Sequence, residues 1–165
     1  MKILLFFISR PSVKLSQTQL RQRTKISKAT LVNWARLLVR NNFLLEERIG
    51  ATKLYSLNSK SPVVRQLKIL NTLMQLNVAQ IKKKFQCEIY LYGSAARGED
   101  VEESDIDLLV IGKLKKEQII SEIDKISNRI GRIVKVQIFN QVEWSMLASK
   151  DPAFYERVEK DKIEL

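Results

Sequence analysis

Two apolar runs that flank a short polar segment restrict the fold of this chain more than any other feature. Glu88–Tyr92 has the composition of a strand and is followed at once by Gly93 and Ser94. An acidic loop then leads to a second apolar run, which starts at Asp105 and ends at Ile111. Two strands joined in this way predict that the carboxy-terminal half is built around a small sheet.

The polar residues of this segment are of the types that phosphate chemistry requires. Gly93 would let the backbone pass close to a triphosphate, Ser94 would offer a hydroxyl and amide donors, and Arg97 would add positive charge. Asp105 and Asp107 are two residues apart on a strand, so both carboxylates face the same side. The pair predicts a site for Mg²⁺ or Mn²⁺, with oxygen ligands.

Cysteine and histidine content narrows the possible chemistry. The chain has one cysteine, Cys87, and no histidine, which excludes an internal disulfide, a cysteine-based zinc site and an imidazole base. Any metal must therefore be held by oxygen.

The two aspartates have an alternative interpretation, a solvated acidic loop with an Asx turn. Paired carboxylates inside an apolar strand, however, cost stability unless a cation binds them.

The phrase GSAARGEDVEESDIDLLVIG resembles the nucleotidyltransferase superfamily of the DNA polymerase beta type, in particular its minimal members. The matching residues are Gly93-Ser94 and, after a spacer, Asp105-Ile106-Asp107. The resemblance implies a small mixed sheet flanked by helices over residues 86–165. It also implies bound magnesium and a nucleoside triphosphate, here ATP, with Ser94, Asp105 and Asp107 as catalytic residues and Gly93, Ser94 and Arg97 at the nucleotide.

The family's third carboxylate is missing from the last predicted strand, residues 133–139. In active members this group serves as a base and as a second metal ligand. Alternation places Lys135 and Gln137 where the acidic residue is expected, and Lys135 would repel a second magnesium ion. Deprotonation by the substrate or by a metal-bound hydroxide could bypass the missing base. A loop glutamate could also substitute for it: Glu99, Glu102 or Glu103. The sequence leaves open whether transfer activity survives.

The first 60 residues carry nearly all of the excess positive charge. They hold 12 Lys and Arg against 2 Asp and Glu, whereas residues 61–165 hold 17 against 16. Two capped helices, after Ser16 and Ser27, precede a predicted hairpin over residues 43–57. Through this order and its apolar spacing, the segment resembles the winged helix-turn-helix family, which implies double-stranded DNA as partner and is compatible with a homodimer.

The resemblance assigns DNA contacts to the second capped helix and to the hairpin. The predicted contact residues are Lys28, Thr30, Asn33 and Arg36 on the helix, and Arg48 and Lys53 on the hairpin. The alternative is an ordinary solvated helix face, since winged helices also bind proteins.

Residues 61–85 are predicted to form one connector helix, which gives an α+β chain of three segments, 1–60, 61–85 and 86–165. The opening apolar run is too short for a membrane span, so the expected location is the cytoplasm.

Two functions follow from these interpretations. The main hypothesis is a DNA-binding transcriptional regulator whose second domain binds magnesium and nucleotide with weak or lost transfer chemistry. The alternative is an active enzyme that transfers AMP to a protein hydroxyl. Minimal nucleotidyltransferases include antitoxins that modify a helical toxin, and the resemblance implies such a partner here.

Overall fold

The computed structural model describes residues 2–165, which form two compact units, residues 2–71 and residues 72–165. The boundary lies inside helix α4, Pro62–Gln75. Val64 at the start of this helix belongs to the core of the first unit, and Leu73 near its end packs against the core of the second. No helix among residues 2–165 is long and apolar enough to cross a membrane.

The single connector helix predicted for residues 61–85 is wrong, because the helix is interrupted. Helix α4 ends at Gln75 and a separate helix α5 spans Ala79–Phe85. Leu76 and Val78, in the break, are both buried in the second core. Residues two apart on a helix point in nearly opposite directions, so burying both side chains in one core requires the chain to leave the helical path.

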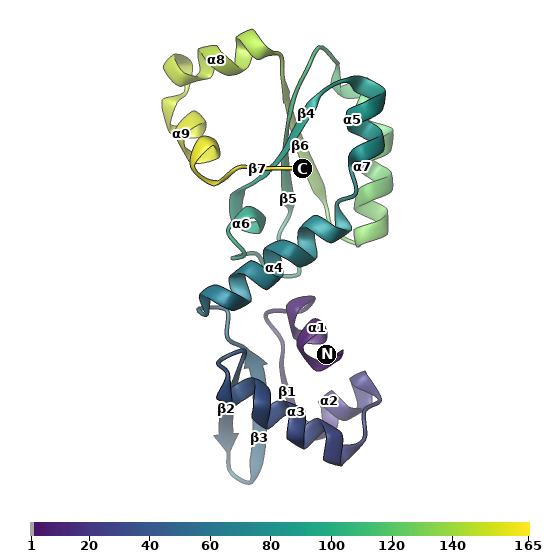
Figure 1. Cartoon of the computed structure of the whole chain (residues 1–165), viewed down its shortest axis with the longest axis vertical. Helices are drawn as coiled ribbons and strands as arrows, with labels where there is room; N and C mark the ends of the chain where they lie inside the picture. Colours follow the sequence, from purple (N-terminus) through teal and green to yellow (C-terminus); the bar gives the residue numbers. More distant parts are fainter. Residues whose placement is uncertain (1) are drawn as a thin grey trace. The chain divides into compact units, whose positions relative to one another are not determined.

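The first unit combines helices with a three-stranded antiparallel sheet (Figure 1). Its elements are α1 (Lys2–Ile8), β1 (Lys14–Ser16), α2 (Gln17–Thr24), α3 (Lys28–Arg40), β2 (Leu44–Ile49) and β3 (Thr52–Leu57). The predicted hairpin is confirmed as the β2–β3 pair, and β1, which the sequence did not reveal, adds to the other edge of β3.

Two helices of the first unit begin at the capping residues that the sequence predicted. The Ser16 hydroxyl accepts a hydrogen bond from the backbone N–H of Gln19, and the Gln19 side chain accepts one from the N–H of Ser16. The Ser27 hydroxyl caps α3 by accepting a hydrogen bond from the backbone N–H of Thr30, without the reciprocal bond seen at Ser16. The face predicted to be buried on α3 is confirmed by three residues that are at most 6% exposed: Leu31, Ala35 and Leu38.

The second unit is built on a mixed four-stranded sheet in the order β6-β5-β4-β7. Its remaining elements are β4 (Glu88–Tyr92), α6 (Gly93–Ala96), β5 (Ile106–Ile111), α7 (Lys116–Ile130), β6 (Val134–Phe139), α8 (Gln141–Lys150), α9 (Pro152–Asp161) and β7 (Ile163–Glu164). Strands β4 and β5 are antiparallel, and β5 and β6 are parallel. The small mixed sheet flanked by helices that the resemblance implied is confirmed.

Helices cover both faces of this sheet. Figure 1 shows α5 and α7 along one side and α8 and α9 along the other. Ile106, Leu108 and Val110 of β5 face the first side, where they pack with residues of α5 and α7. Leu109 and Ile111 face the second side, where they pack with Trp144 and Val158 of α8 and α9. Asp107 alternates with the first set and therefore shares the second face.

Candidate active site

Gly93 stands where β4 ends, directly against the carboxylate of Asp107. The backbone at Gly93 is left-handed, with a φ of 76°. A Cβ atom at this position would lie 2.8 Å from the Asp107 Oδ2 atom, closer than real Cβ contacts come. Gly93 therefore meets two requirements at once, a backbone that L side chains rarely adopt and the space beside a carboxylate.

Asp107 is the second residue of β5, and Asp105 comes just before the strand begins. Asp107 is in register with Tyr92 on β4 and with Lys135 on β6. Ile106 between the two aspartates is 1% exposed and points into the opposite core. The register brings Asp107 next to Gly93, and the Asp105 carboxylate is near enough to raise the pKa of Asp107. That the two carboxylates share one face of the strand stays a prediction.

Arg132 holds the loop that leads into these aspartates. Its Nη1 atom lies 2.7 Å from Asp100 Oδ2, and its Nε and Nη2 atoms donate to the carbonyl oxygen of Ser104 at 2.9 and 2.7 Å. Asp100 is 4% exposed. The guanidinium thus fixes both ends of the loop just before Asp105. Sequence reasoning missed Arg132, although its place immediately before a predicted strand, after Gly131, was a usable signal.

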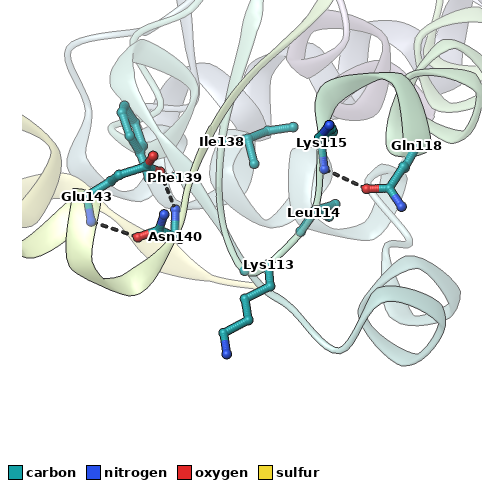
Figure 2. A pocket seen from close by; sticks show the side chains of 9 residues that line it. Lys113, Leu114, Lys115, Gln118, Ile138, Phe139, Asn140 and Glu143 are labelled. Atoms are coloured by element: carbon teal, nitrogen blue, oxygen red, sulfur yellow. Dashed lines mark hydrogen bonds between the residues drawn. The ribbon is translucent and has the colours of Figure 1, made fainter.

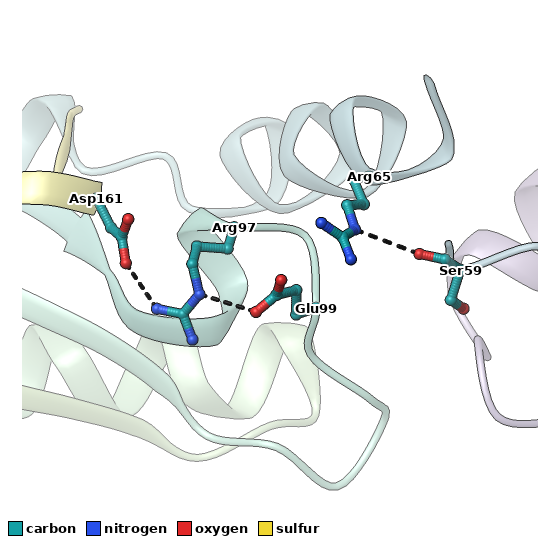
Figure 3. Close-up of polar contacts among 5 residues, drawn as sticks. All are labelled: Ser59, Arg65, Arg97, Glu99 and Asp161. Atoms are coloured by element: carbon teal, nitrogen blue, oxygen red, sulfur yellow. Dashed lines mark hydrogen bonds and ion pairs between the residues drawn. The ribbon is translucent and has the colours of Figure 1, made fainter. Parts of the chain in front are cut away.

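Ser94 and Arg97 follow Gly93 in and beside the short helix α6. The Ser94 carbonyl accepts a hydrogen bond from the backbone of Glu99 at 2.9 Å. Figure 3 shows the Arg97 guanidinium between two carboxylates, with Nε 2.8 Å from Glu99 and Nη1 2.7 Å from Asp161. These two partners raise the pKa of Arg97. The predicted phosphate contact of Arg97 would require part of this network to open.

Lys135 takes the place beside Asp107 where the family's third carboxylate was expected. The parallel register sets Lys135 opposite Asp107 and Gln137 opposite Leu109. The ammonium of Lys135 is ion-paired with Asp105 Oδ2, which raises the pKa of Lys135. Among residues 2–165 there is no group of three histidine, cysteine or acidic side chains arranged to hold a metal.

Burial and the neighbouring cations shift the pKa of Asp107 in opposite directions. Burial raises the pKa of this carboxyl, Lys135 and Arg157 lower it, and the neighbouring Asp105 carboxylate raises it. A half-buried carboxylate beside a second one is stabilised by a cation, and carboxylate oxygens suit Mg²⁺ and Mn²⁺. The two aspartates therefore fit one divalent cation, and they are the residues that would hold it.

Arg157 and Tyr92 complete the surroundings of Asp107, and neither was predicted. Tyr92 is 6% exposed, and its pKa is raised mainly by burial and also by the Asp107 carboxylate, while Arg157 and a hydrogen bond with Gln137 lower it. The Arg157 guanidinium also stacks 5.4 Å from the Phe154 ring. Arg157 comes from α9, far along the chain, and no local motif links it to the Gly-Ser turn.

A hollow of about 760 Å³ lies at the other end of β5 and β6, away from the aspartates (Figure 2). Two helices begin there, and both are capped internally. Gln118 accepts from the backbone N–H of Lys115 at 2.6 Å. Asn140 accepts from the N–H of Glu143 at 2.9 Å, and Glu143 accepts from the N–H of Asn140 at 2.8 Å. The Gly-Ser and Asp-x-Asp motifs, on which the expected chemistry depends, lie at the opposite end of these strands.

In the first unit, the predicted DNA-contact residues divide into two groups. Those on α3 are exposed: Lys28, Thr30, Asn33 and Arg36. On the hairpin, the Lys53 ammonium is 2.7 Å from Glu46 Oε1 and the Arg48 guanidinium is 4.0 Å from it. These two pairs lower the pKa of Glu46. The hairpin cations are thus partly compensated, whereas those of α3 have no acidic residue within their helix.

Comparison with known proteins concerns mainly the second unit. Residues 75–164, more than half of the chain, match the nucleotidyltransferase domain family. A protein of Methanocaldococcus jannaschii that is provisionally named a protein adenylyltransferase is 33% identical over 82 residues, which are 46% of this chain and 77% of that protein. No solved structure matches the chain. The family match begins at residue 75 and does not include the predicted DNA-contact residues.

Proposed function

This chain belongs to the nucleotidyltransferase domain family, and on that premise we propose that its second unit transfers AMP from ATP to a hydroxyl group of a protein. The observation that carries the proposal is the packing of Gly93 against Asp107, with the Asp105 carboxylate near enough to act on the Asp107 charge. The provisional name of the archaeal relative supports this enzyme more than the main hypothesis from the sequence, a regulator with weak or lost transfer chemistry.

Each residue near the Gly-Ser turn has a role in this proposal. Gly93 leaves room for the triphosphate beside the strand, and Ser94 donates its hydroxyl to a phosphate oxygen. Asp105 and Asp107 hold one divalent cation. Such a cation supplies charge neutralisation for the departing pyrophosphate. Arg157, whose charge acts on Asp107, lies where it meets the charge of the bound phosphates.

The transfer forms one bond and breaks another. The acceptor hydroxyl oxygen bonds to the α-phosphorus of ATP, and the bond from that phosphorus to the bridging oxygen breaks, so that pyrophosphate leaves with its electron pair. Strand β6 carries Lys135 rather than a carboxylate beside Asp107. In this proposal the hydroxyl proton therefore goes to the departing pyrophosphate instead of to a base on β6. Substrate-assisted proton transfer is slower than transfer to a positioned base, by about 10²–10⁴-fold.

Transfer of label from ATP to protein tests this function. The purified chain is incubated with extract of its host cells, Mg²⁺ and ATP labelled at either the α- or the γ-phosphate. We expect protein-bound label from the α-phosphate only, since pyrophosphate carries the γ-phosphate away. The Asp105→Ala variant should incorporate none, and the matched Asp124→Ala variant, which removes an exposed carboxylate of α7, should incorporate as much as the parent.

Label from the γ-phosphate would indicate a kinase, and absence of label in spite of measurable ATP binding would indicate that the unit only binds nucleotide. Either result would overturn the proposed transfer.

A second candidate function is duplex DNA binding by the first unit. The sequence resemblance to winged helices suggests this function, and α3 exposes Lys28, Asn33 and Arg36 with no acidic residue in the helix. The excess charge of residues 1–60 supports a polyanionic partner. The pairing of Lys53 with Glu46 weakens the predicted hairpin contact.

Fluorescence anisotropy with a labelled random duplex at several salt concentrations tests this binding. Arg36→Ala should weaken it and should reduce the slope of log affinity against log salt by about one. Arg129→Ala, on the second unit, is the matched control and should change neither. An affinity that does not depend on salt would contradict DNA binding by this surface.

A further inference from the structure

The position of Lys135 is fixed by the sheet. Strands β5 and β6 are parallel, and their register places Lys135 directly beside Asp107. The ammonium is ion-paired with the carboxylate of Asp105. Lys135 thus adjoins both predicted metal ligands, one through the strand register and the other through its side chain.

The charge of this group limits the number of divalent cations that it can hold. Asp105 and Asp107 supply two negative charges, Lys135 supplies one positive charge, and residues 2–165 contain no third acidic or other metal-ligating side chain grouped with them. Sites with two metal ions hold them about 3.5–4 Å apart. The three side chains therefore carry one net negative charge, which offsets only half the charge of one divalent cation. A second divalent cation would in addition be repelled by the neighbouring ammonium.

Lys135 can also reach a ligand. Its side chain is 62% exposed, while that of Asp105 is 28% exposed, so the ammonium sits on the open side of the pair. A lysine ammonium binds phosphate oxygens as a point charge with three donors. Beside the aspartates, it can supply to a phosphate the positive charge that a second metal ion would otherwise supply.

We infer that Lys135 takes the place of the second metal ion, so that this chain binds its nucleotide with a single divalent cation and with the Lys135 ammonium on the phosphates. This inference rests on the proposed function, because it requires a site for metal and nucleotide at Asp105 and Asp107. It goes beyond that function by giving the site a metal count and by assigning Lys135 a direct contact with the substrate.

The metal count can be measured without turnover. The chain is saturated with Mn²⁺ and an ATP analogue that carries a methylene group between the α- and β-phosphates, and retained manganese and nucleotide are measured after rapid gel filtration. Electron paramagnetic resonance then separates an isolated Mn²⁺ ion from a spin-coupled pair. We expect one manganese per bound nucleotide in the parent, with the signal of an isolated ion.

Replacement of the lysine should change the count. Lys135→Asp restores a third carboxylate, and we expect two manganese ions per nucleotide with a spin-coupled signal. Lys135→Gln removes the charge without adding a ligand, and we expect one ion and about tenfold weaker nucleotide binding. Lys113→Asp, the matched charge reversal at the opposite end of β5, should behave as the parent does.

The outcomes separate this inference from the proposed function. Two coupled ions in the parent would overturn the role of Lys135 and leave the nucleotidyltransferase proposal standing, and this result requires no variant. A single ion in a folded Lys135→Asp protein would also overturn it. Absence of both manganese and nucleotide from the parent would overturn the proposed function and this inference with it.

Discussion

At the scale of single residues, the site depends on how little space separates the turn after β4 from the start of β5. Gly93 directly follows β4, and the antiparallel register of β4 with β5 brings this glycine against the Asp107 carboxylate. A left-handed glycine also occurs at Gly131, with a φ of 73° against 76° at Gly93, but no atom lies within 4 Å of the Cβ position there. A side chain at Gly131 would thus strain only the backbone, whereas one at Gly93 would also crowd the Asp107 carboxylate.

Alanine substitution at both glycines uses this difference. Each should lower the free energy of unfolding by about 1 kcal/mol, because both force a left-handed backbone on a residue with a side chain. Only Gly93→Ala displaces Asp107, so it should weaken binding of Mg²⁺ and ATP by about tenfold or more. Urea unfolding and calorimetry of the two variants check this expectation. Equal ATP affinity in both would contradict the assigned contact.

Asp107 should leave a trace in the pH dependence of stability. Its pKa is raised in the folded protein, chiefly by burial, above the value of about 3.9 expected in the unfolded chain. A raised carboxyl pKa gives stability that is present below the unfolded pKa and is lost as the pH rises through the folded pKa. The stability of Asp107→Asn relative to the parent should therefore increase from pH 4 to pH 7. Thermal unfolding in metal-free buffer tests this, and a constant difference would contradict it.

At the scale of elements, the loop between α6 and β5 is held by Arg132, which lies two residues before β6. Arg132 binds the buried Asp100 carboxylate and the Ser104 carbonyl oxygen, and its own side chain is 17% exposed. Loss of one member of a buried ion pair leaves the other without its compensating charge. The loop that delivers Asp105 therefore depends on a residue of a different strand segment.

Arg132→Ala should lower the free energy of unfolding by about 3 kcal/mol. It should also speed amide hydrogen exchange over residues 98–105. Arg132→Lys keeps the charge but not the fork of donors, so it should recover part of the loss. Lys116→Ala, which removes an exposed ammonium of α7, is the control and should stay within about 0.5 kcal/mol. Unchanged exchange over the loop would contradict the role of Arg132.

The elements that local pattern determines were predicted well, and those that depend on distant contacts were not. Strand β4 and the caps at Ser16 and Ser27 follow from local alternation and side-chain chemistry. The apolar spacing from Val63 to Val78 predicted one helix because it gives no sign that Leu76 and Val78 would enter the same core. Strands β1 and β7 have three and two residues, which is too short for any period to be recognised.

The candidate site divides in the same way. Gly93, Asp105 and Asp107 could be identified because they lie within one short phrase, and their mutual approach agrees with the strand register. The pairing of Lys135 with Asp105 and the nearness of Arg157 to Asp107 depend on elements that follow much later in the chain. Alternation along the last strand placed Lys135 at the site but did not indicate its pairing with Asp105. The Arg157 side chain meets the motif only after α9 has packed, so no local pattern indicates it.

At the scale of the whole molecule, the excess positive charge and the predicted catalytic residues lie in different units. Residues 1–60 hold 12 of the 29 basic residues and only 2 of the 18 acidic ones, whereas the predicted catalytic residues all lie in the second unit. Mutations in separate compact units with no shared partners act independently as a rule. The two proposed activities should therefore be separable by substitution.

Asp105→Ala should abolish binding of Mg²⁺ and ATP and leave the affinity for a DNA duplex unchanged. Arg36→Ala should have the reverse effect. The four binding constants, measured by calorimetry and anisotropy in the same buffer, test this independence. A loss of DNA affinity in Asp105→Ala, with the protein folded by circular dichroism, would contradict it.

Calorimetric titration of ATP with Mg²⁺ into the purified chain, beside an Asp105→Ala, Asp107→Ala double variant and the exposed-site control Asp124→Ala, is the most direct test of the central claim. The account predicts saturable binding of one nucleotide to the parent and to the control, and none to the double variant. Equal binding to the double variant, or no binding to the folded parent, would contradict the assignment of the Gly93 turn and the two aspartates as the site for metal and nucleotide.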